Sequence, residues 1–215
     1  MTALDKASLL QRWHCLRREM DEAGVRLLAV SKYAADEAVD CLIGAGQRDF
    51  AESRPQALRD RASRWPACAW HMIGPVQKNK AKYIARHAAM WHSVEDAQTA
   101  TLVARHVQGR VLPVLLQVNL TGHPRRHGVM VDHLGRLFEE VGRIRGLRVE
   151  GLMCMAGQND DARATFRQLR CLRDELFGGS LGHLCMGMSG DYRIAIEERA
   201  TMVRLGTALF GSRAA

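Results

Sequence analysis

Lys32 carries an amine at a position in the sequence where it could take part in covalent chemistry. The run of residues 27–32 reads Leu-Leu-Ala-Val-Ser-Lys, an apolar strand pattern that ends on Lys32. A lysine that is partly desolvated and close to a cationic group can lose its proton and attack a carbonyl carbon. The simpler interpretation is a surface lysine at an exposed strand end, because lysine side chains are usually exposed.

Two further stretches combine a hydroxyl group with glycine. Ser189 lies in the stretch Gly-Met-Ser-Gly-Asp, and Gly206 and Thr207 end the stretch Arg-Leu-Gly-Thr. The hydroxyls can donate to phosphate oxygens, and the glycines let backbone N–H groups approach the same oxygens. The two stretches therefore predict an anion site. The alternative for Ser189 is a cap on the helix expected to begin near Asp191.

The elements that must position these residues alternate along the chain. Apolar residues three and four positions apart indicate helices, and short apolar runs indicate buried strands. The expected strands are Arg26–Lys32, Asp49–Ser53, Ala69–Gly74, Met90–Val94, Val111–Leu120, Arg148–Met155, His183–Ser189 and Met202–Phe210. The expected helices are Leu4–Glu22, Ala34–Ala45, Arg54–Arg64, Gln77–His87, Glu95–Val107, Val131–Arg145, Asp161–Phe177 and Tyr192–Arg199.

Eight strands that alternate with helices favour an α/β fold: a single (β/α)8 TIM barrel with an extra N-terminal helix. We expect one domain over residues 1–215, with the extra helix in 1–24. A doubly wound open sheet is the structural alternative, but residues 31–35 contain no glycine, which disfavours a dinucleotide site. In a closed barrel the first strand lies beside the eighth, so Lys32 would face Ser189 and Thr207. A phosphate pocket beside an amine suggests pyridoxal 5'-phosphate (PLP) as the cofactor.

Composition and charge exclude several other classes of protein. The formal charge is +8, without a dense basic run or interleaved aromatic residues, so we expect no nucleic-acid partner. A ligand that carries phosphate suits this sign equally well. The six cysteines are scattered without metal-like spacing, so we expect reduced thiols and no metal site. No apolar run is long enough for a signal peptide or a membrane span, so we expect a cytoplasmic protein.

Several motifs occur in a fixed order along the chain. They are Ala29–Lys32, Trp70–Lys80, Gly151–Met153, Gly187–Asp191 and Met202–Gly211. In this order they resemble the YggS/PROSC family of PLP homeostasis proteins, which are single-domain relatives of the alanine racemase N-terminal barrel (fold type III). The resemblance implies a barrel that holds PLP as a Schiff base, the internal aldimine, on Lys32.

The resemblance also implies the other residues that bind the cofactor. The phosphate would be held by Ser189, Gly206 and Thr207, the pyridine nitrogen would face Arg204, and the ring could be lined by Met188 and His71. Core packing is an equal alternative for Met188 and His71. Because a guanidinium keeps its proton, the ring nitrogen would stay unprotonated and the cofactor would be a weak electron sink.

The chain departs from the family pattern at three places. The family usually shows Phe-Gly-Glu-Asn-Tyr after the second strand, whereas residues 50–54 here read Phe-Ala-Glu-Ser-Arg. Ser53 thus replaces an asparagine that could approach the ring oxygen. Arg199 stands at a usual glycine position, and Arg126 replaces a usual lysine in the loop after the fifth strand.

The resemblance favours a monomeric protein that holds PLP for intracellular homeostasis, with little or no catalysis and no catalytic residue. Apo forms of PLP-dependent enzymes are its possible partners. The alternative is a PLP-dependent amino-acid racemase or lyase of narrow scope. Racemisation with two bases needs a second base, and none of the three tyrosines has an evident claim to that role, although Tyr33 adjoins Lys32.

Overall fold

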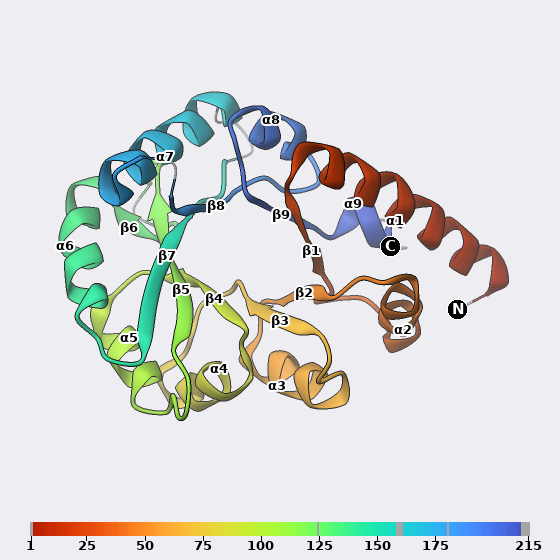
Figure 1. The fold of residues 1–215 in the computed structure, drawn as a ribbon, viewed down its shortest axis with the longest axis horizontal. Coiled ribbons are helices and arrows are strands. Elements are labelled where there is room, and N and C mark those ends of the chain that lie inside the picture. The colour runs from red at the N-terminus through yellow and green to blue at the C-terminus, as the bar shows by residue number, and fades with distance from the viewer. Residues whose placement is uncertain (1, 124, 158–160, 180, 212–215) are drawn as a thin grey trace.

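The computed structural model describes residues 2–123, 125–157, 161–179 and 181–211. Helices and strands alternate from one end of this part of the chain to the other (Figure 1). The strands are β1 (Arg26–Val30), β2 (Asp49–Glu52), β3 (Ala69–Met72), β4 (Met90–Val94), β5 (Leu112–Asn119), β6 (Val129–Met130), β7 (Leu147–Met153), β8 (His183–Cys185) and β9 (Met202–Leu205). The helices are α1 (Ala3–Ala23), α2 (Asp36–Ala45), α3 (Pro55–Arg64), the short 3-10 helix η1 (Lys78–Lys80), α4 (Ala81–His87), α5 (Ala97–Ala104), α6 (Val131–Gly142), α7 (Ala162–Phe177), α8 (Tyr192–Glu197) and α9 (Thr207–Phe210).

Eight parallel strands close into a barrel. They follow the order β4-β3-β2-β1-β9-β8-β7-β5, and β4 pairs with β5 to complete the ring. The ninth strand, β6, pairs only with β5 and stands outside the ring. The helices surround the strands, as Figure 1 shows. Because β1 pairs with β9, with Ala29 opposite Leu205, residues from the two ends of the chain meet at one point of the rim.

The barrel interior has its own apolar core, separate from the layer between strands and helices. Its buried members come from seven of the strands: Leu28, Ala51, Met90, Leu115, Met153, Cys185 and Met202. Unbranched methionines can fill the irregular space that converging strands leave. The larger core lies between the strands and the surrounding helices, and it includes Phe50, Trp70 and Trp91.

Helix α1 is tied to the barrel at several points. A capping box between Thr2 and Asp5 begins the helix, and Gly24, with a φ of 66°, ends it in the left-handed region that glycine adopts at low cost. Arg12 Nε donates to the carbonyl of Leu209 in α9 at 2.8 Å. The helix therefore covers the junction where the first and last strands meet. Within the described ranges, no helix combines the length and apolarity that crossing a membrane requires.

The structure confirms the (β/α)8 barrel with its extra N-terminal helix and corrects several boundaries. The first strand ends at Val30, so Lys32 lies in a turn beyond the strand and does not close it. The eighth barrel strand ends at Leu205, and 207–210, expected as strand, form α9 because the N–H groups of Leu209 and Phe210 both donate to the Gly206 carbonyl. The strand expected over 183–189 is only His183–Cys185, and the two-residue β6 was not expected.

Candidate functional site

Lys32 lies on a tight turn at the carboxyl end of β1. Ser31 N–H still donates to the carbonyl of Ala51 at 3.1 Å, and Ala34 N–H then donates back to the Ser31 carbonyl at 2.8 Å. The two residues at the tip of this turn, Lys32 and Tyr33, are exposed. Lys32 Nζ lies 5.2 Å from the centre of the Tyr33 ring. The amine is therefore accessible and is carried by a hydrogen-bonded turn.

One cavity lies between this turn and the segment that follows the last strand. It has a volume of about 520 Å³ and is lined by Val30, Lys32 and Tyr33 on one side and by Gly206, Thr207 and Phe210 on another. The pairing of β1 with β9 brings the two sides together. Lys32, Gly206 and Thr207, all expected to bind the cofactor, therefore share a cavity.

Ser189 links the loop after β8 to the start of α9. Its Oγ accepts a hydrogen bond from the backbone N–H of Ala208 at 3.0 Å. It does not cap α8, whose N-cap residue is Asp191. The alternative that Ser189 caps the helix beginning near Asp191 is therefore wrong, because its hydroxyl bonds to α9 instead. Ser189 lines a different cavity of about 460 Å³, beside Tyr192 and Ala208, so it does not share the lining of the Lys32 cavity.

Arg204 is buried inside the barrel, with 4% of the residue exposed. Its two terminal nitrogens donate to backbone carbonyls at the ends of neighbouring strands, Nη1 to Cys185 and Nη2 to Cys154, each at 2.8 Å. Burial raises the pKa of the Cys154 thiol to about 12, and the charge of Arg204 offsets this only in part. The thiol is therefore neutral beside a fixed positive charge.

Met188 and His71, the two candidates for lining the ring, lie in different surroundings. Met188 is exposed and lines a cavity of about 400 Å³ together with residues of the loop after β5, Arg126 among them. His71 is buried, with Nδ1 2.8 Å from His92 Nε2 and Nε2 3.2 Å from Asp49 Oδ1. Neither side chain lines the cavity that contains Lys32.

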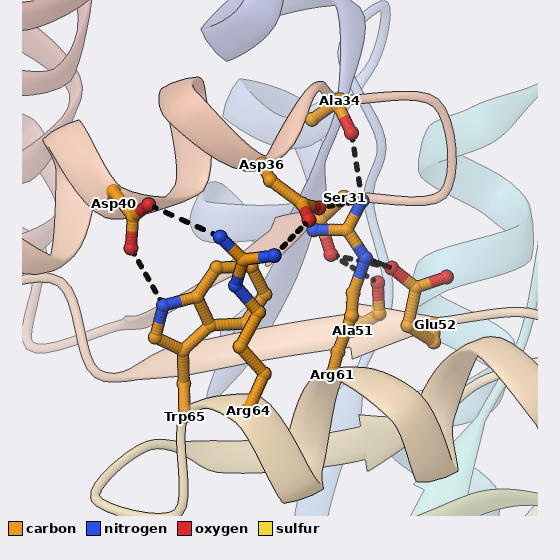
Figure 2. Close-up of polar contacts among 9 residues, drawn as sticks. All are labelled: Ser31, Ala34, Asp36, Asp40, Ala51, Glu52, Arg61, Arg64 and Trp65. Atoms are coloured by element: carbon orange, nitrogen blue, oxygen red, sulfur yellow. Dashed lines mark hydrogen bonds and ion pairs between the residues drawn. The ribbon is translucent and has the colours of Figure 1, made fainter.

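A pair of charged residues that the sequence analysis did not single out lies directly behind the lysine turn. Figure 2 shows Arg61 of α3 reaching between Glu52, at the end of β2, and the backbone of Ala34. Arg61 Nε lies 3.0 Å from Glu52 Oε1, and Nη2 donates to the Ala34 carbonyl at 2.7 Å. Glu52 could have been noticed in the sequence, because a carboxylate at the end of a buried strand is unusual. No sequence pattern identifies Arg61 as its partner.

Comparison with known proteins defines the class first. The model of the alanine racemase N-terminal domain family matches residues 4–214, which spans the barrel and α1. Alanine racemase from Clostridium difficile shares the fold, with a TM-score of 0.77 at 13% identity over 99% of this chain and 58% of that one. The protein is thus a barrel of the alanine racemase N-terminal-domain class.

Closer relatives narrow the class. A pyridoxal phosphate homeostasis protein from Deinococcus radiodurans is 41% identical over 195 residues, which is 86% of this chain and 88% of the relative. The structure of PipY from Synechococcus elongatus with PLP bound has a TM-score of 0.85 at 32% identity, over 94% of this chain and 100% of PipY. The chain belongs to the family of pyridoxal phosphate homeostasis proteins, as the motifs implied.

Proposed function

We propose that this protein binds PLP, holds it covalently through Lys32 and serves PLP homeostasis with little or no catalysis. The observation that carries the proposal is the single cavity in which the Lys32 amine lies with Gly206 and Thr207. The choice of ligand is supported by the relatives named for PLP homeostasis and by the similar structure of PipY, which has PLP bound. When bound, the cofactor supplies an aldehyde that an amine can capture reversibly and a ring that can withdraw electrons.

The groups present suit a phosphorylated aldehyde. The Lys32 amine is accessible, and Thr207 and Gly206 offer a hydroxyl and a backbone N–H in the same cavity. Ser189 Oγ already accepts the Ala208 N–H, so its own hydrogen can be donated to an anion. Among the described residues, no acceptor is bonded to that hydrogen. Arg204, if it faces the pyridine nitrogen, keeps its proton and leaves that nitrogen unprotonated.

Turnover of a single amino acid is the competing function. The observation that favours it is Tyr33, whose side chain lines the cavity beside Lys32 and could supply a second base. Incubation of the purified protein with single L-amino acids, with chirality and loss followed over time, tests it. Sustained turnover of any one of them would replace the homeostasis proposal.

Partners, location and domain organisation are part of the same proposal. All six cysteines are free, which supports a reducing compartment and hence the cytoplasm. Attachment of α1 through Arg12 supports one domain over residues 1–215, of which 1, 124, 158–160, 180 and 212–215 lie outside the described residues. The proposal also includes a monomeric state and transfer of the cofactor to apo forms of PLP-dependent enzymes. It includes no nucleic-acid partner.

Reduction with borohydride tests the covalent attachment. The protein is incubated with PLP and reduced, and the labelled peptide is identified by mass spectrometry. We expect a pyridoxyl mass on the peptide that contains Lys32, complete loss of the label in Lys32→Ala, and an unchanged label in the control Lys82→Ala. A label that persists in Lys32→Ala would assign the attachment to another amine and overturn the proposal.

A further inference from the structure

The turn that carries Lys32 is held at each end by one member of a pair of charged side chains. At the first end, Ser31 Oγ donates to Glu52 Oε1 at 2.7 Å. At the second end, the Ala34 carbonyl accepts from Arg61 at 2.7 Å. Glu52 and Arg61 are themselves paired at 3.0 Å, so the two anchors form one connected unit (Figure 2). Only the tip of the turn, residues 32 and 33, lies outside this unit.

The unit is buried, although the turn it holds is exposed. Ser31 is fully buried, and the side chains of Glu52 and Arg61 are 1% and 14% exposed. Burial raises the pKa of the Glu52 carboxyl, while the Ser31 bond and the Arg61 charge lower it in part. A buried carboxylate without a cation is costly, and Arg61 supplies a cation in direct contact with Glu52. Arg61 can then hold the Ala34 carbonyl with a nitrogen that Glu52 does not use.

A second arginine one turn along α3 shares one carboxylate, Asp36, with Arg61, whose Nη2 lies 3.7 Å from Asp36 Oδ1. Arg64 pairs with Asp36 at 2.7 Å and lies 4.8 Å from the Trp65 ring, while Trp65 Nε1 donates to Asp40 at 2.6 Å. These contacts join α3 to α2 at an exposed site, because the Arg64 side chain is 55% exposed. Figure 2 shows Arg64 directed at α2 and away from Ser31 and Glu52. Arg64 thus provides a matched control for Arg61.

We propose that the Glu52–Arg61 pair positions Lys32, holding the turn of residues 31–34 so that the amine meets the carbonyl of a ligand seated at Gly206 and Thr207. The proposal rests on the proposed function, because it takes Lys32 as the attachment site. Bond formation between Nζ and an aldehyde carbon releases one water and transfers no electrons. When the turn holds the amine in position, the effective concentration of the amine at the carbonyl rises, although no contact to the ring or the phosphate is added.

Two ligands separate positioning from general damage to the cavity. The affinity for PLP includes contributions from the phosphate, the ring and the covalent bond. Pyridoxine 5'-phosphate carries an alcohol in place of the aldehyde, so its affinity includes only the phosphate and ring contributions. For Arg61→Met we expect at least tenfold weaker binding of PLP and an affinity for pyridoxine 5'-phosphate within twofold of the wild type. Glu52→Gln, which still accepts from Ser31, should shift PLP binding in the same direction by less. The double variant should be no worse than Arg61→Met alone, because the two residues act as one unit.

Three results would overturn the proposal. These are an unchanged PLP affinity in Arg61→Met, an equal loss for both ligands, and an equal loss of PLP affinity in the control Arg64→Met. A wild-type protein that forms no bond at Lys32 would instead refute the proposed function. Hydrogen exchange of the Ala34 amide in the ligand-free protein then decides the positioning role. Arg61→Met should accelerate this exchange at least tenfold and Arg64→Met should not, and equal exchange in the two variants would contradict it.

Discussion

Arg199 occupies a backbone conformation that its side chain does not favour. It follows the end of α8 with a φ of 68°, and no other residue except glycine in the described ranges has a positive φ. The N–H of Ala200 donates to the Ala195 carbonyl at 2.8 Å, which ends the helix with the left-handed residue that commonly follows a helix end. Glycine adopts this conformation at little cost, whereas a Cβ is strained there.

The first prediction at this scale is that Arg199→Gly stabilises the protein. Relief of the left-handed strain should raise the free energy of unfolding by about 0.5–1 kcal/mol, after allowance for the greater freedom of glycine in the unfolded chain. Urea denaturation followed by circular dichroism measures the change. Arg199→Ala, which keeps the Cβ, is the control and should bring no comparable gain. An equal gain in both variants would locate the effect in the arginine side chain and not in the backbone.

At the scale of elements, Ser189 connects the loop after β8 to helix α9, which lies further along the chain. Its hydroxyl accepts the Ala208 N–H, which belongs to the first turn of α9, where N–H groups have no partner within the helix. The Ser189 side chain therefore joins the loop after β8 to the helix after β9 by a hydrogen bond. The sequence did not predict this contact, because residues 207–210 were expected to continue the last strand.

We predict that Ser189→Ala loosens this connection. Loss of the acceptor should lower the free energy of unfolding by about 1 kcal/mol. Loss of the hydroxyl donor should weaken PLP binding about tenfold, because a hydrogen bond to a charged group is worth about 1.5 kcal/mol or more. Urea denaturation and titration with PLP measure the two effects. Ser189→Thr keeps the hydroxyl and should retain most of both. Unaltered PLP affinity in Ser189→Ala would remove Ser189 from the phosphate site.

Most elements were predictable because their periodicity is strong, and the exceptions have physical causes. Each expected strand and helix has a counterpart, with ends that shift by a few residues. The segment 207–210 was misassigned because Thr-Ala-Leu-Phe is too short to distinguish a strand from a helix turn. Lys32 was assigned to the strand because the turn closed by Ala34 contains no glycine or proline to mark it. The Glu52–Arg61 pair joins a strand to the next helix, and periodicity says nothing about such contacts.

Closure of the whole barrel explains which parts of the site could be predicted. Counting eight strands places the first beside the last, and β1 does pair with β9, so the meeting of Lys32 with Gly206 and Thr207 was predictable. The division of the rim into separate cavities was not, because it depends on how the side chains pack. Met188 and Ser189 accordingly line other cavities than Lys32.

Three strands of the closed barrel also carry a hydrogen-bonded chain of polar side chains. His92 is fully buried and bonded through Nε2 to His71, which is bonded in turn to Asp49. Burial lowers the pKa of His92 well below 6.5, and the charges of His71 and Arg204 lower it further. Burial also lowers the pKa of His183, at the start of β8. In contrast, burial raises the pKa of the Asp49 carboxyl, but the His71 bond and the charges of His71, Arg26 and Arg17 together outweigh burial and leave this pKa lowered.

The last prediction is that acid destabilises the whole molecule partly through His92. Since its pKa is lower in the folded state, the unfolded chain binds more protons just below pH 6.5. The stability that neutral His92 permits is therefore full above 6.5 and is lost as the pH falls towards the lowered value. The slope is up to about 1.4 kcal/mol per pH unit for one such group. Urea denaturation between pH 5 and 7.5 should show a shallower decline in His92→Gln than in the wild type, whatever the stability of the variant at pH 7.5. The exposed His133→Gln should keep the wild-type slope, and an equally steep decline in His92→Gln would assign the acid sensitivity to other groups.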